Sequence, residues 1–168
     1  MSMVKDRVAI VTGGGRGIGR GISELLASEG ATVAVNYRRD AGAAADTVAT
    51  ITSAGGSARA YAASVDDPDG CAEMVRRVLD DFGGVDILVC NAGIASRGLP
   101  VADTDPAEMI RVVATHAFGP HHLARLVLPS MRTRGRGDIV MISSVATSSF
   151  GPNGAPYNMG KAAWKPSP

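Results

Sequence analysis

The chain has 168 residues, of which 45% are hydrophobic and 20% are charged, and its formal net charge at pH 7 is +1. This length allows one domain with one sizeable core but not two, so we expect a single domain over residues 1–168. The near-neutral charge and an aromatic content of only 4% argue against the basic and stacking surfaces of nucleic-acid binding.

The first residues enter an apolar strand pattern at Val8 without the features of a secretion signal. No apolar run approaches the length that crosses a bilayer, so we expect a cytoplasmic protein without a membrane partner. Cys71 and Cys90 lack CxxC spacing and are expected to be small buried residues. The sequence therefore predicts no metal site and no disulfide.

Apolar runs rich in valine and isoleucine alternate with segments of helical period along the chain. This alternation is typical of βα units around a parallel sheet that is buried on both faces. The predicted strands are Val8–Thr12, Thr32–Asn36, Ser57–Ala63, Val85–Cys90 and Asp138–Ser143. The fold class that follows is α/β, with a doubly wound parallel sheet between two helical layers.

The helix after the first strand carries an apolar stripe and ends at Gly30, which suits a C-terminal cap. Its stripe is formed by Ile18, Ile22, Leu25 and Leu26. The next helix, Asp40–Ser53, is mostly alanine and threonine. A third helix begins with Asp67 as N-cap and Pro68 at its first position. Its apolar stripe is formed by Met74, Val75, Val78, Leu79 and Phe82.

A fourth helix begins in the same way, with Asp105 as N-cap and Pro106 at its first position. Glu108 is three residues after the cap, where it would complete a capping box. We expect a break in this helix at Gly119–Pro120 and its end near the basic, glycine-containing stretch before the fifth strand.

A glycine-rich turn, TGGGRGIG, directly follows the first strand and opens a helix. At such a turn the free N–H groups and the positive end of the helix dipole would meet a pyrophosphate. The spacing fits neither a strict GxGxxG nor a P-loop, because Arg20 and Gly21 stand where the P-loop requires Lys and Ser or Thr. The alternative is a turn that serves only tight packing of the strand and helix.

The end of the second strand indicates which dinucleotide would bind. A dinucleotide-binding unit that prefers NAD has an acidic residue here, which accepts from the ribose 2′-OH. This chain has Tyr37 instead, followed by Arg38 and Arg39, and Arg16 of the glycine turn can reach the same region. Guanidinium groups bind the extra phosphate of NADP, so NADP is favoured over NAD. The alternative is a solvated pair of arginines.

Three further segments sit at carboxyl ends of strands, the sheet edge where open parallel sheets bind ligands. They are CNAG (Cys90–Gly93), MISS (Met141–Ser144) and a helix that begins near Tyr157. Tyr157 and Lys161 form a Tyr-x-x-x-Lys pair, thirteen residues after Ser144. With the glycine turn, these motifs resemble the short-chain dehydrogenase/reductase family over nearly the whole chain, and in particular its 3-oxoacyl-[acyl-carrier-protein] reductases.

The resemblance implies a Rossmann-type domain that reduces a ketone or a 3-oxoacyl group to an alcohol, reversibly. Ser144 would hydrogen-bond the carbonyl oxygen and Tyr157 would deliver the proton. A tyrosine hydroxyl titrates near pH 10 in water, so it needs a nearby cation, and Lys161 lies on the same helix face. The substrate would be a small carbonyl compound, an alcohol or an acyl thioester, and full-length members of the family would be homo-oligomers.

The cofactor-binding residues that the resemblance implies lie along the whole chain. They are Gly13, Arg16, Gly17, Ile18, Gly19, Tyr37, Arg38, Ser64, Val65, Asn91, Ala92, Gly93, Tyr157 and Lys161. Two positions depart from the family pattern. His116 occupies the place of an asparagine that supports a proton relay behind the lysine, and Ser64 occupies the place of an aspartate near the adenine. An imidazole can donate and accept hydrogen bonds, but it is larger than the amide.

The resemblance ends at Trp164–Pro168, where family members continue through further strand-helix units. We therefore expect a sheet that lacks these C-terminal units, a last helix stopped by Pro166, and an exposed apolar edge at the fifth strand. Two interpretations stay open. The chain is an active reductase, or it is a truncated dinucleotide-binding fragment with weak or no turnover.

Overall fold

The computed structural model describes residues 2–148 and 152–164. Its strands form one five-stranded parallel sheet in the order β3-β2-β1-β4-β5. The strands are β1 (Val8–Val11), β2 (Thr32–Tyr37), β3 (Ser57–Ala62), β4 (Ile87–Cys90) and β5 (Asp138–Met141). Every strand end lies within two residues of its predicted place, so the predicted strands are confirmed.

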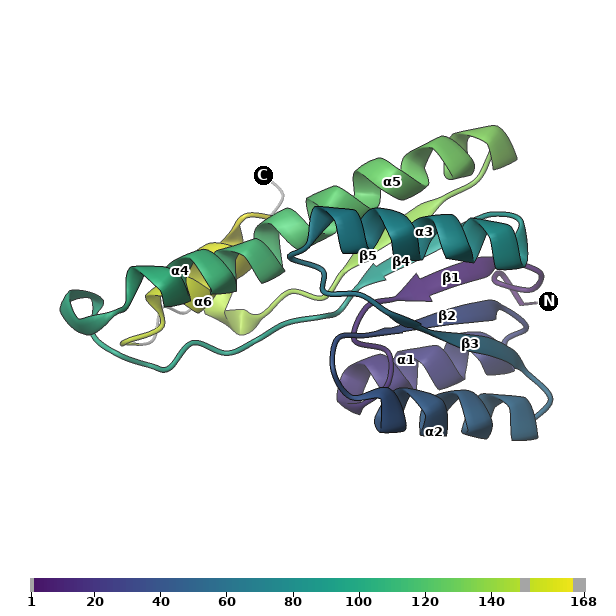
Figure 1. Cartoon of the computed structure of the whole chain (residues 1–168), viewed down its shortest axis with the longest axis horizontal. Coiled ribbons are helices and arrows are strands. Elements are labelled where there is room, and N and C mark those ends of the chain that lie inside the picture. The colour runs from purple at the N-terminus through teal and green to yellow at the C-terminus, as the bar shows by residue number, and fades with distance from the viewer. Residues whose placement is uncertain (1, 149–151, 165–168) are drawn as a thin grey trace.

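Helices cover both faces of this sheet. They are α1 (Gly17–Ser28), α2 (Ala41–Ser53), α3 (Pro68–Phe82), α4 (Pro106–Val113), α5 (Gly119–Arg134) and α6 (Ala155–Ala162). Shorter helical turns are η1 (Val101–Asp103), η2 (Ala114–Phe118) and η3 (Val145–Thr147). Helices α3 and α5 lie on one face and α1 and α2 on the other, which confirms the three-layer α/β class (Figure 1). Helices α4 and α6 project beyond the carboxyl ends of the strands.

The core has two halves, one on each face of the sheet. Ile10 and Leu88 belong to the cluster packed against α3 and α5, whereas Val11 and Val33 belong to the cluster against α1 and α2. Alternate strand residues thus face opposite layers, as the pleat of a strand requires. The apolar stripe predicted for α3 is confirmed, because all its members belong to the first cluster or pack against it.

The apolar stripe predicted for α1 is confirmed only in part, because Ile22 and Leu26 pack against the core and the other two members do not. Ile18 and Leu25 of the predicted stripe are 69% and 64% exposed. The residues that α1 buries completely are small, namely Gly19, Ser23 and Ala27. Small side chains let the helix approach β1 closely, so its large residues lie to the sides of the contact.

Helix α4 begins at the predicted cap, since the Asp105 carboxylate accepts a hydrogen bond from the Ala107 amide at 2.8 Å. The predicted capping box is wrong. The side chain of Glu108 is buried, and its carboxylate accepts from the backbone amide of Arg97. A tertiary contact with the loop after β4 thus replaces the local cap.

The predicted break at Gly119–Pro120 is also wrong. Helix α4 continues through the π-helical turn η2 into α5 without interruption. Pro120 has no amide N–H to donate, and it lies just after the π turn, where the regular α-helical hydrogen-bond pattern is already changed.

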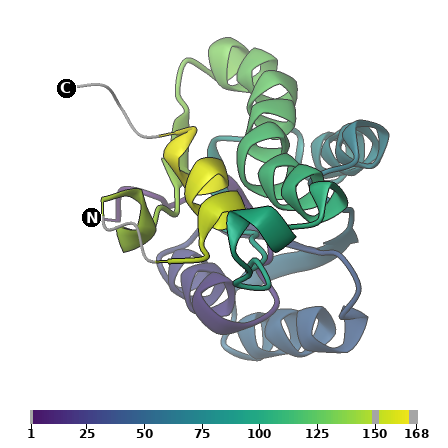
Figure 2. The same cartoon turned by 90° about the vertical axis from the view of Figure 1, so that its left-hand side faces the viewer.

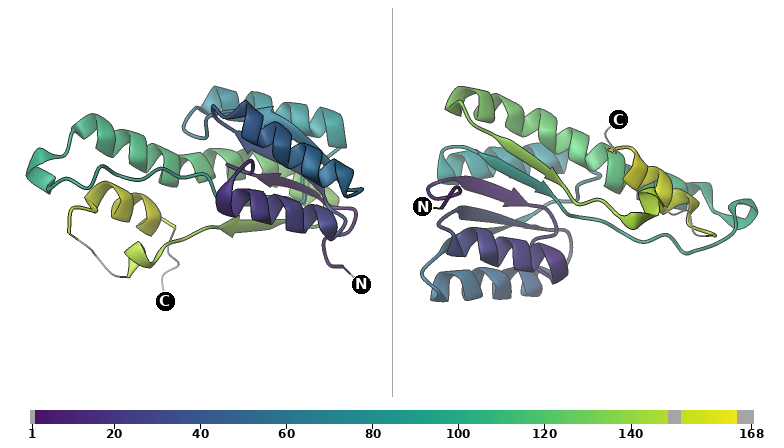
Figure 3. Two further views of the ribbon diagram at one scale, coloured as in Figure 1. Left: turned by 90° about the horizontal axis from the view of Figure 1, so that it is seen from below. Right: turned by 180° about the vertical axis from the view of Figure 1, so that it is seen from behind.

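Among the described strands, β5 lies at the edge of the sheet and pairs with β4 alone (Figure 3). Ile139 and Val140 are 37% and 44% exposed, so the predicted apolar edge is confirmed. An apolar strand edge with free N–H and C=O groups favours association with other chains. Pro166, which was predicted to stop the last helix, lies outside the described residues.

The amino-terminal side of the sheet is held by Asp86, a completely buried carboxylate just before β4. It accepts hydrogen bonds from the Val8 amide at 2.9 Å, from Arg134 Nε at 2.7 Å and from Arg136 Nε at 2.8 Å. Burial raises the pKa of Asp86, but the hydrogen bonds from Arg134, Arg136 and Val8 lower it by a larger amount. The pKa of Asp86 therefore lies well below its usual range. The hydrogen bond from Val8 and the two ion pairs thus connect β1, the start of β4 and the end of α5.

Replacing Asp86 by Asn should lower the free energy of unfolding by about 1–3 kcal/mol at pH 7, because the charge-assisted hydrogen bonds from two partly exposed arginines are lost. The folded pKa of Asp86 is depressed, so its contribution is complete above the unfolded value near 4 and is lost as the pH falls through the folded value. The loss should therefore shrink on acidification. Urea unfolding of both proteins between pH 7 and pH 3 measures it.

The matched control is Asp80→Asn, which removes a carboxylate from an exposed ion pair with Arg76 on α3. Solvent screens that pair, so the change should cost far less. Equal losses for the two variants would contradict the structural role of Asp86.

Candidate functional site

The glycine turn Gly13–Gly19 joins β1 to α1 and is anchored by Thr12. The buried Thr12 hydroxyl accepts from the amides of Asn91 and Ala92, each at 2.9 Å, and donates to the Val89 carbonyl at 3.2 Å. The Asn91 side-chain amide in turn donates to the Thr12 carbonyl at 2.8 Å. These bonds fix the carboxyl ends of β1 and β4 against each other.

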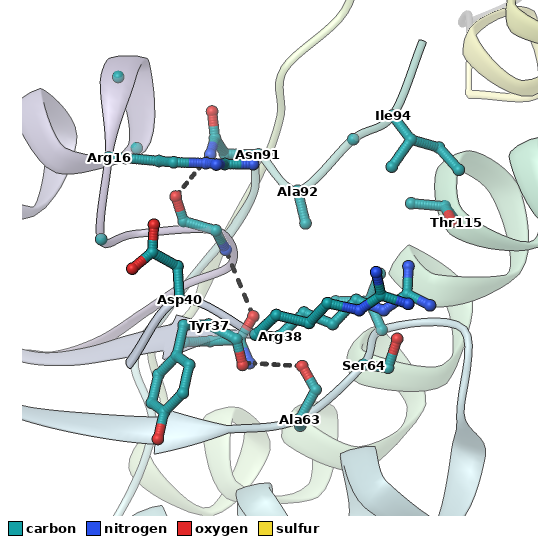
Figure 4. Close-up of a pocket in the computed structure, with 18 of the residues that line it drawn as sticks. Arg16, Tyr37, Arg38, Asp40, Ala63, Ser64, Asn91, Ala92, Ile94 and Thr115 are labelled. Carbon is teal, nitrogen blue, oxygen red and sulfur yellow. Dashed lines mark hydrogen bonds between the residues drawn. The ribbon is translucent and has the colours of Figure 1, made fainter. Parts of the chain in front are cut away.

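Asn36 at the end of β2 holds the other side of the turn. Its side-chain oxygen accepts from the Gly13 amide at 3.3 Å, and its side-chain nitrogen donates to the carbonyls of Tyr61 and Ala63. Ala63 is labelled in Figure 4. The side chain is buried, so these bonds also satisfy a polar group that would otherwise be costly. Asn36 was not among the predicted site residues, although a polar residue at the end of an apolar strand is a signal for it.

Gly19 is required where the turn enters α1. A Cβ at this position would overlap the Gly13 carbonyl oxygen and the Asn91 side chain. The first turn of α1 therefore lies directly against the ends of β1 and β4. Helix α1 begins at Gly17, and the backbone amides of a first helical turn attract anions.

The strand ends and the turn enclose a groove of about 710 Å³ at the carboxyl edge of the sheet. Every predicted cofactor-binding residue from Gly13 to Gly93 lines this groove. Tyr157 and Lys161 do not line it; they lie on α6, beyond the sheet.

The lining also includes residues that the sequence analysis did not select. Asp66 follows β3, and Arg111 and Thr115 come from α4 and η2. The last two are far from the strands in sequence, and no local motif marks them. Arg39 and Ile94 also line the groove, and their neighbours Arg38 and Gly93 could have indicated them.

The groove carries positive charge that has no partner in the described part of the chain. Arg16, Arg38 and Arg39 line it, and none of the three forms an ion pair there. In Figure 4 the side chains of Arg16 and Arg38 extend across the groove, Arg38 toward Ser64. Two acids also line the groove: the Asp66 carboxylate accepts from the Ser64 hydroxyl, and the Asp40 carboxylate accepts from the Ala43 amide at the start of α2. Unpaired guanidinium groups in a groove favour an anionic ligand.

Helix α6 carries Tyr157 and Lys161 beside α4 and η2 (Figure 2). The Lys161 ammonium lies 5.9 Å from the centre of the Tyr157 ring and donates to the Ile142 carbonyl at 2.6 Å. Burial lowers the pKa of Lys161. The spacing of one helical turn thus brings a half-buried cation close to the phenol ring.

A small hollow beside Lys161 is lined by Ser143, His116 and Trp164. The Trp164 indole donates to the Ala117 carbonyl at 3.1 Å, which fastens the residues after α6 to η2. Ser144 lines neither this hollow nor the groove. Its hydroxyl oxygen accepts from the Ala146 amide at 3.2 Å and caps the short turn η3.

Other site types find no support in the described residues. No group of three or more potential metal ligands is present among them. Cys71 and Cys90 are both buried and unpaired, as predicted. None of the helices in the segments 2–148 and 152–164 has the length and apolar character that a membrane crossing needs.

The chain is similar to proteins of known sequence and structure over most of its length. It is 39% identical over 158 residues to versicolorin reductase stcU of Emericella nidulans, and 36% identical over 157 residues to the 3-oxoacyl-[acyl-carrier-protein] reductase FabG of Staphylococcus epidermidis. Each match covers 94% of this chain, but 59% and 64% of the respective relative. The chain thus spans about three fifths of the length of these relatives.

Solved structures agree with the fold. A metagenomic short-chain oxidoreductase in complex with NADP superimposes with a TM-score of 0.91 at 35% identity, covering 95% of this chain and 72% of that one. An NAD+-bound xylitol dehydrogenase gives 0.90 at 31% identity, covering 96% and 62%.

The sequence pattern described as short chain dehydrogenase matches residues 7–166, which include the glycine turn, the strand ends around the groove and the tyrosine-lysine pair. The fold, the order of the motifs and the similarity to relatives agree with this match. The chain therefore belongs to the short-chain dehydrogenase/reductase family.

Proposed function

We propose that this chain belongs to an NADP-dependent oxidoreductase that reduces a ketone or a 3-oxoacyl group to an alcohol, reversibly. The observation that carries the proposal is the groove beside the glycine turn, which has free arginines at the end of β2 and a tyrosine-lysine helix beyond its other end. These features combine a site for an anionic dinucleotide with a proton donor.

The residues present fit such a cofactor. A Cβ on Gly17 would meet no protein atom, so the backbone at the start of α1 is open to a ligand. We infer that Gly13, Gly17 and Gly19 bind the pyrophosphate, and that Asn91, Ala92 and Gly93 line the path toward α6. Ile18, Val65 and Tyr37 would contact the rest of the cofactor along the groove.

The extra phosphate of NADP is the basis of the cofactor preference. Arg38, with Arg16 across the groove, would bind it by charge-assisted hydrogen bonds, and Tyr37 places no carboxylate there to repel it. The two solved structures named above hold NADP and NAD+ respectively, so family membership alone does not decide between the cofactors. The free guanidinium groups favour NADP.

The chemistry at α6 is proton transfer. NADPH, when bound, supplies the hydride that the carbonyl carbon accepts. Tyr157 donates a proton to the carbonyl oxygen, and the ammonium of Lys161 stabilises the phenolate that remains. Ser144 would orient the carbonyl oxygen by donating its hydroxyl proton, which the hydrogen bond accepted from the Ala146 amide leaves free. In the reverse direction Tyr157 takes the proton from the alcohol.

The names of two relatives indicate the class of substrate. One relative is a 3-oxoacyl-[acyl-carrier-protein] reductase, whose name states its own substrate, and versicolorin reductase is a second reductase of comparable similarity. Both names are consistent with reduction of a carbonyl group. We therefore propose a small ketone or an acyl thioester as substrate.

A second candidate function is binding of the dinucleotide without turnover. The position of Ser144 favours it, because Ser144 lines neither the groove nor the hollow beside Lys161. The groove residues needed for the adenosine half do not depend on α6.

Replacing Tyr157 by Phe should reduce NADPH oxidation with a panel of ketones by at least a hundredfold, because the variant lacks the acidic hydroxyl. NADPH affinity should stay close to that of the parent chain. The loss of NADPH absorbance measures turnover, and fluorescence titration measures binding. Tyr61→Phe is the control, since it removes a hydroxyl bound to Asp81 away from the groove. A parent chain that binds NADPH but oxidises none with any ketone would support the second candidate.

The parent chain should bind NADPH about ten to a hundred times more tightly than NADH, the range expected from charged hydrogen bonds to one phosphate. Arg38→Asp should reverse this preference, because a carboxylate repels the phosphate and accepts from the ribose. Isothermal titration with both cofactors tests this. Arg132→Asp makes the same charge change at an exposed site on α5 and should leave the ratio unchanged. Equal dissociation constants in the parent would refute the assignment.

A further inference from the structure

His116 lies in the π-helical turn η2 and is only 5% exposed. It is enclosed between two glycines from different parts of the chain. A Cβ on Gly93 would lie 2.6 Å from His116 Cε1, and a Cβ on Gly160 would lie 2.8 Å from His116 Cβ. Both distances are too short for real contacts, so the space for this side chain exists only because both neighbours are glycine.

The imidazole also makes polar and aromatic contacts. Its Nε2 lies 2.7 Å from the Ile94 carbonyl oxygen and 3.2 Å from the Ile94 amide nitrogen. The shorter contact favours the tautomer with the proton on Nε2, which donates it to the carbonyl. The edge of one ring faces the other between His116 and Tyr157, with centres 5.1 Å apart and an interplanar angle of 84°. One side chain thus contacts both the loop after β4 and the helix that carries the tyrosine.

We propose that His116 is a positioning residue that joins the loop Asn91–Ile94 to α6 and sets the position of Tyr157. Gly93 and Gly160 provide the space it needs, so the three residues form one unit, the His116 cage. The proposal rests on the proposed function for the role of Tyr157 as acid/base. Gly93 makes room for the ring, which is larger than an amide, whereas Gly160 makes room for the Cβ of His116.

The charge state fits this role. Burial lowers the pKa of His116, the Ile94 carbonyl opposes that effect, and the positive charge of Lys161 lowers it again, so the pKa lies below its ordinary value. The other titratable groups near the ring are Tyr157 on the same helix as Lys161, and Cys90 of β4, which lines the same hollow. A neutral ring adds no second cation beside Lys161. Because the folded pKa is depressed, stability should fall as the pH drops below the unfolded value of about 6.5.

A double-mutant cycle of Gly93→Ala and His116→Asn tests the cage. The new methyl group collides with ring atoms that asparagine lacks, so Gly93→Ala should be much more harmful with histidine than with asparagine at position 116. The readouts are the free energy of unfolding and the NMR signal of the Tyr157 ring, with Tyr37 and Tyr61 as references in the same spectrum. Gly21→Ala is the matched control, because a Cβ there meets no atom.

Gly93→Ala should shift the Tyr157 signal, raise the pH at which His116 titrates, and lower kcat by roughly ten- to a hundredfold, the cost of a misplaced reacting group. Adding His116→Asn should restore most of the Tyr157 signal and of kcat. If Gly93→Ala fails to fold while the double variant folds, the proposal is supported. Equal effects of Gly93→Ala in both backgrounds, or failure of both variants to fold, would overturn it.

The NMR and unfolding readouts need no turnover. A parent chain that neither binds NADPH nor reduces ketones would therefore refute the proposed function, while the cage would still be judged by the Tyr157 and His116 signals.

Discussion

The hydrogen bonds of Thr12 hold the site together. This one hydroxyl joins the ends of β1 and β4, and through Asn91 it also fixes the carbonyl side of the glycine turn. The side chain of Asn36 in β2 does the same on the other side, because it accepts from the Gly13 amide and donates to the Ala63 carbonyl after β3. The inward-facing polar groups of the turn are satisfied within the protein, so its conformation is set before a ligand arrives. The amides at the start of α1 remain available for an anion.

The amino and carboxyl ends of the strands differ in how their charged groups are paired. At the amino ends of the strands, Asp86 and the arginines around it connect β1, β4 and α5 in a buried network. At the carboxyl ends, unpaired arginines and open backbone line the groove. The charges of Asp86 and its arginines are thus paired at the amino ends, where they stabilise the fold. At the carboxyl ends the groove arginines have no ion pair among the described residues and are available to an anionic ligand.

Tyr157 and Lys161 are held by contacts outside the sheet. Helix α6 has only eight residues, too few for a stable isolated helix, so packing must hold it. That packing comes from α4, from the π turn with His116, and from the bond of Trp164 to Ala117. The position of Tyr157 is thus less tightly determined than that of the glycine turn, which is built into strand ends.

The sequence by itself determined the strands, the α3 stripe, the glycine turn and the tyrosine-lysine pair, because each depends on neighbours a few residues away. It also indicated the groove lining at Arg38 and the exposed edge at β5. Only the tertiary structure decided that Glu108 binds the loop at Arg97, that α1 buries its small residues, and that Thr115 reaches the groove. These outcomes depend on which distant segments come together. His116 shows the difference most clearly. Its side chain fits only because positions 93 and 160 are glycines, and these two positions meet at His116 only through the packing of the loop after β4, η2 and α6.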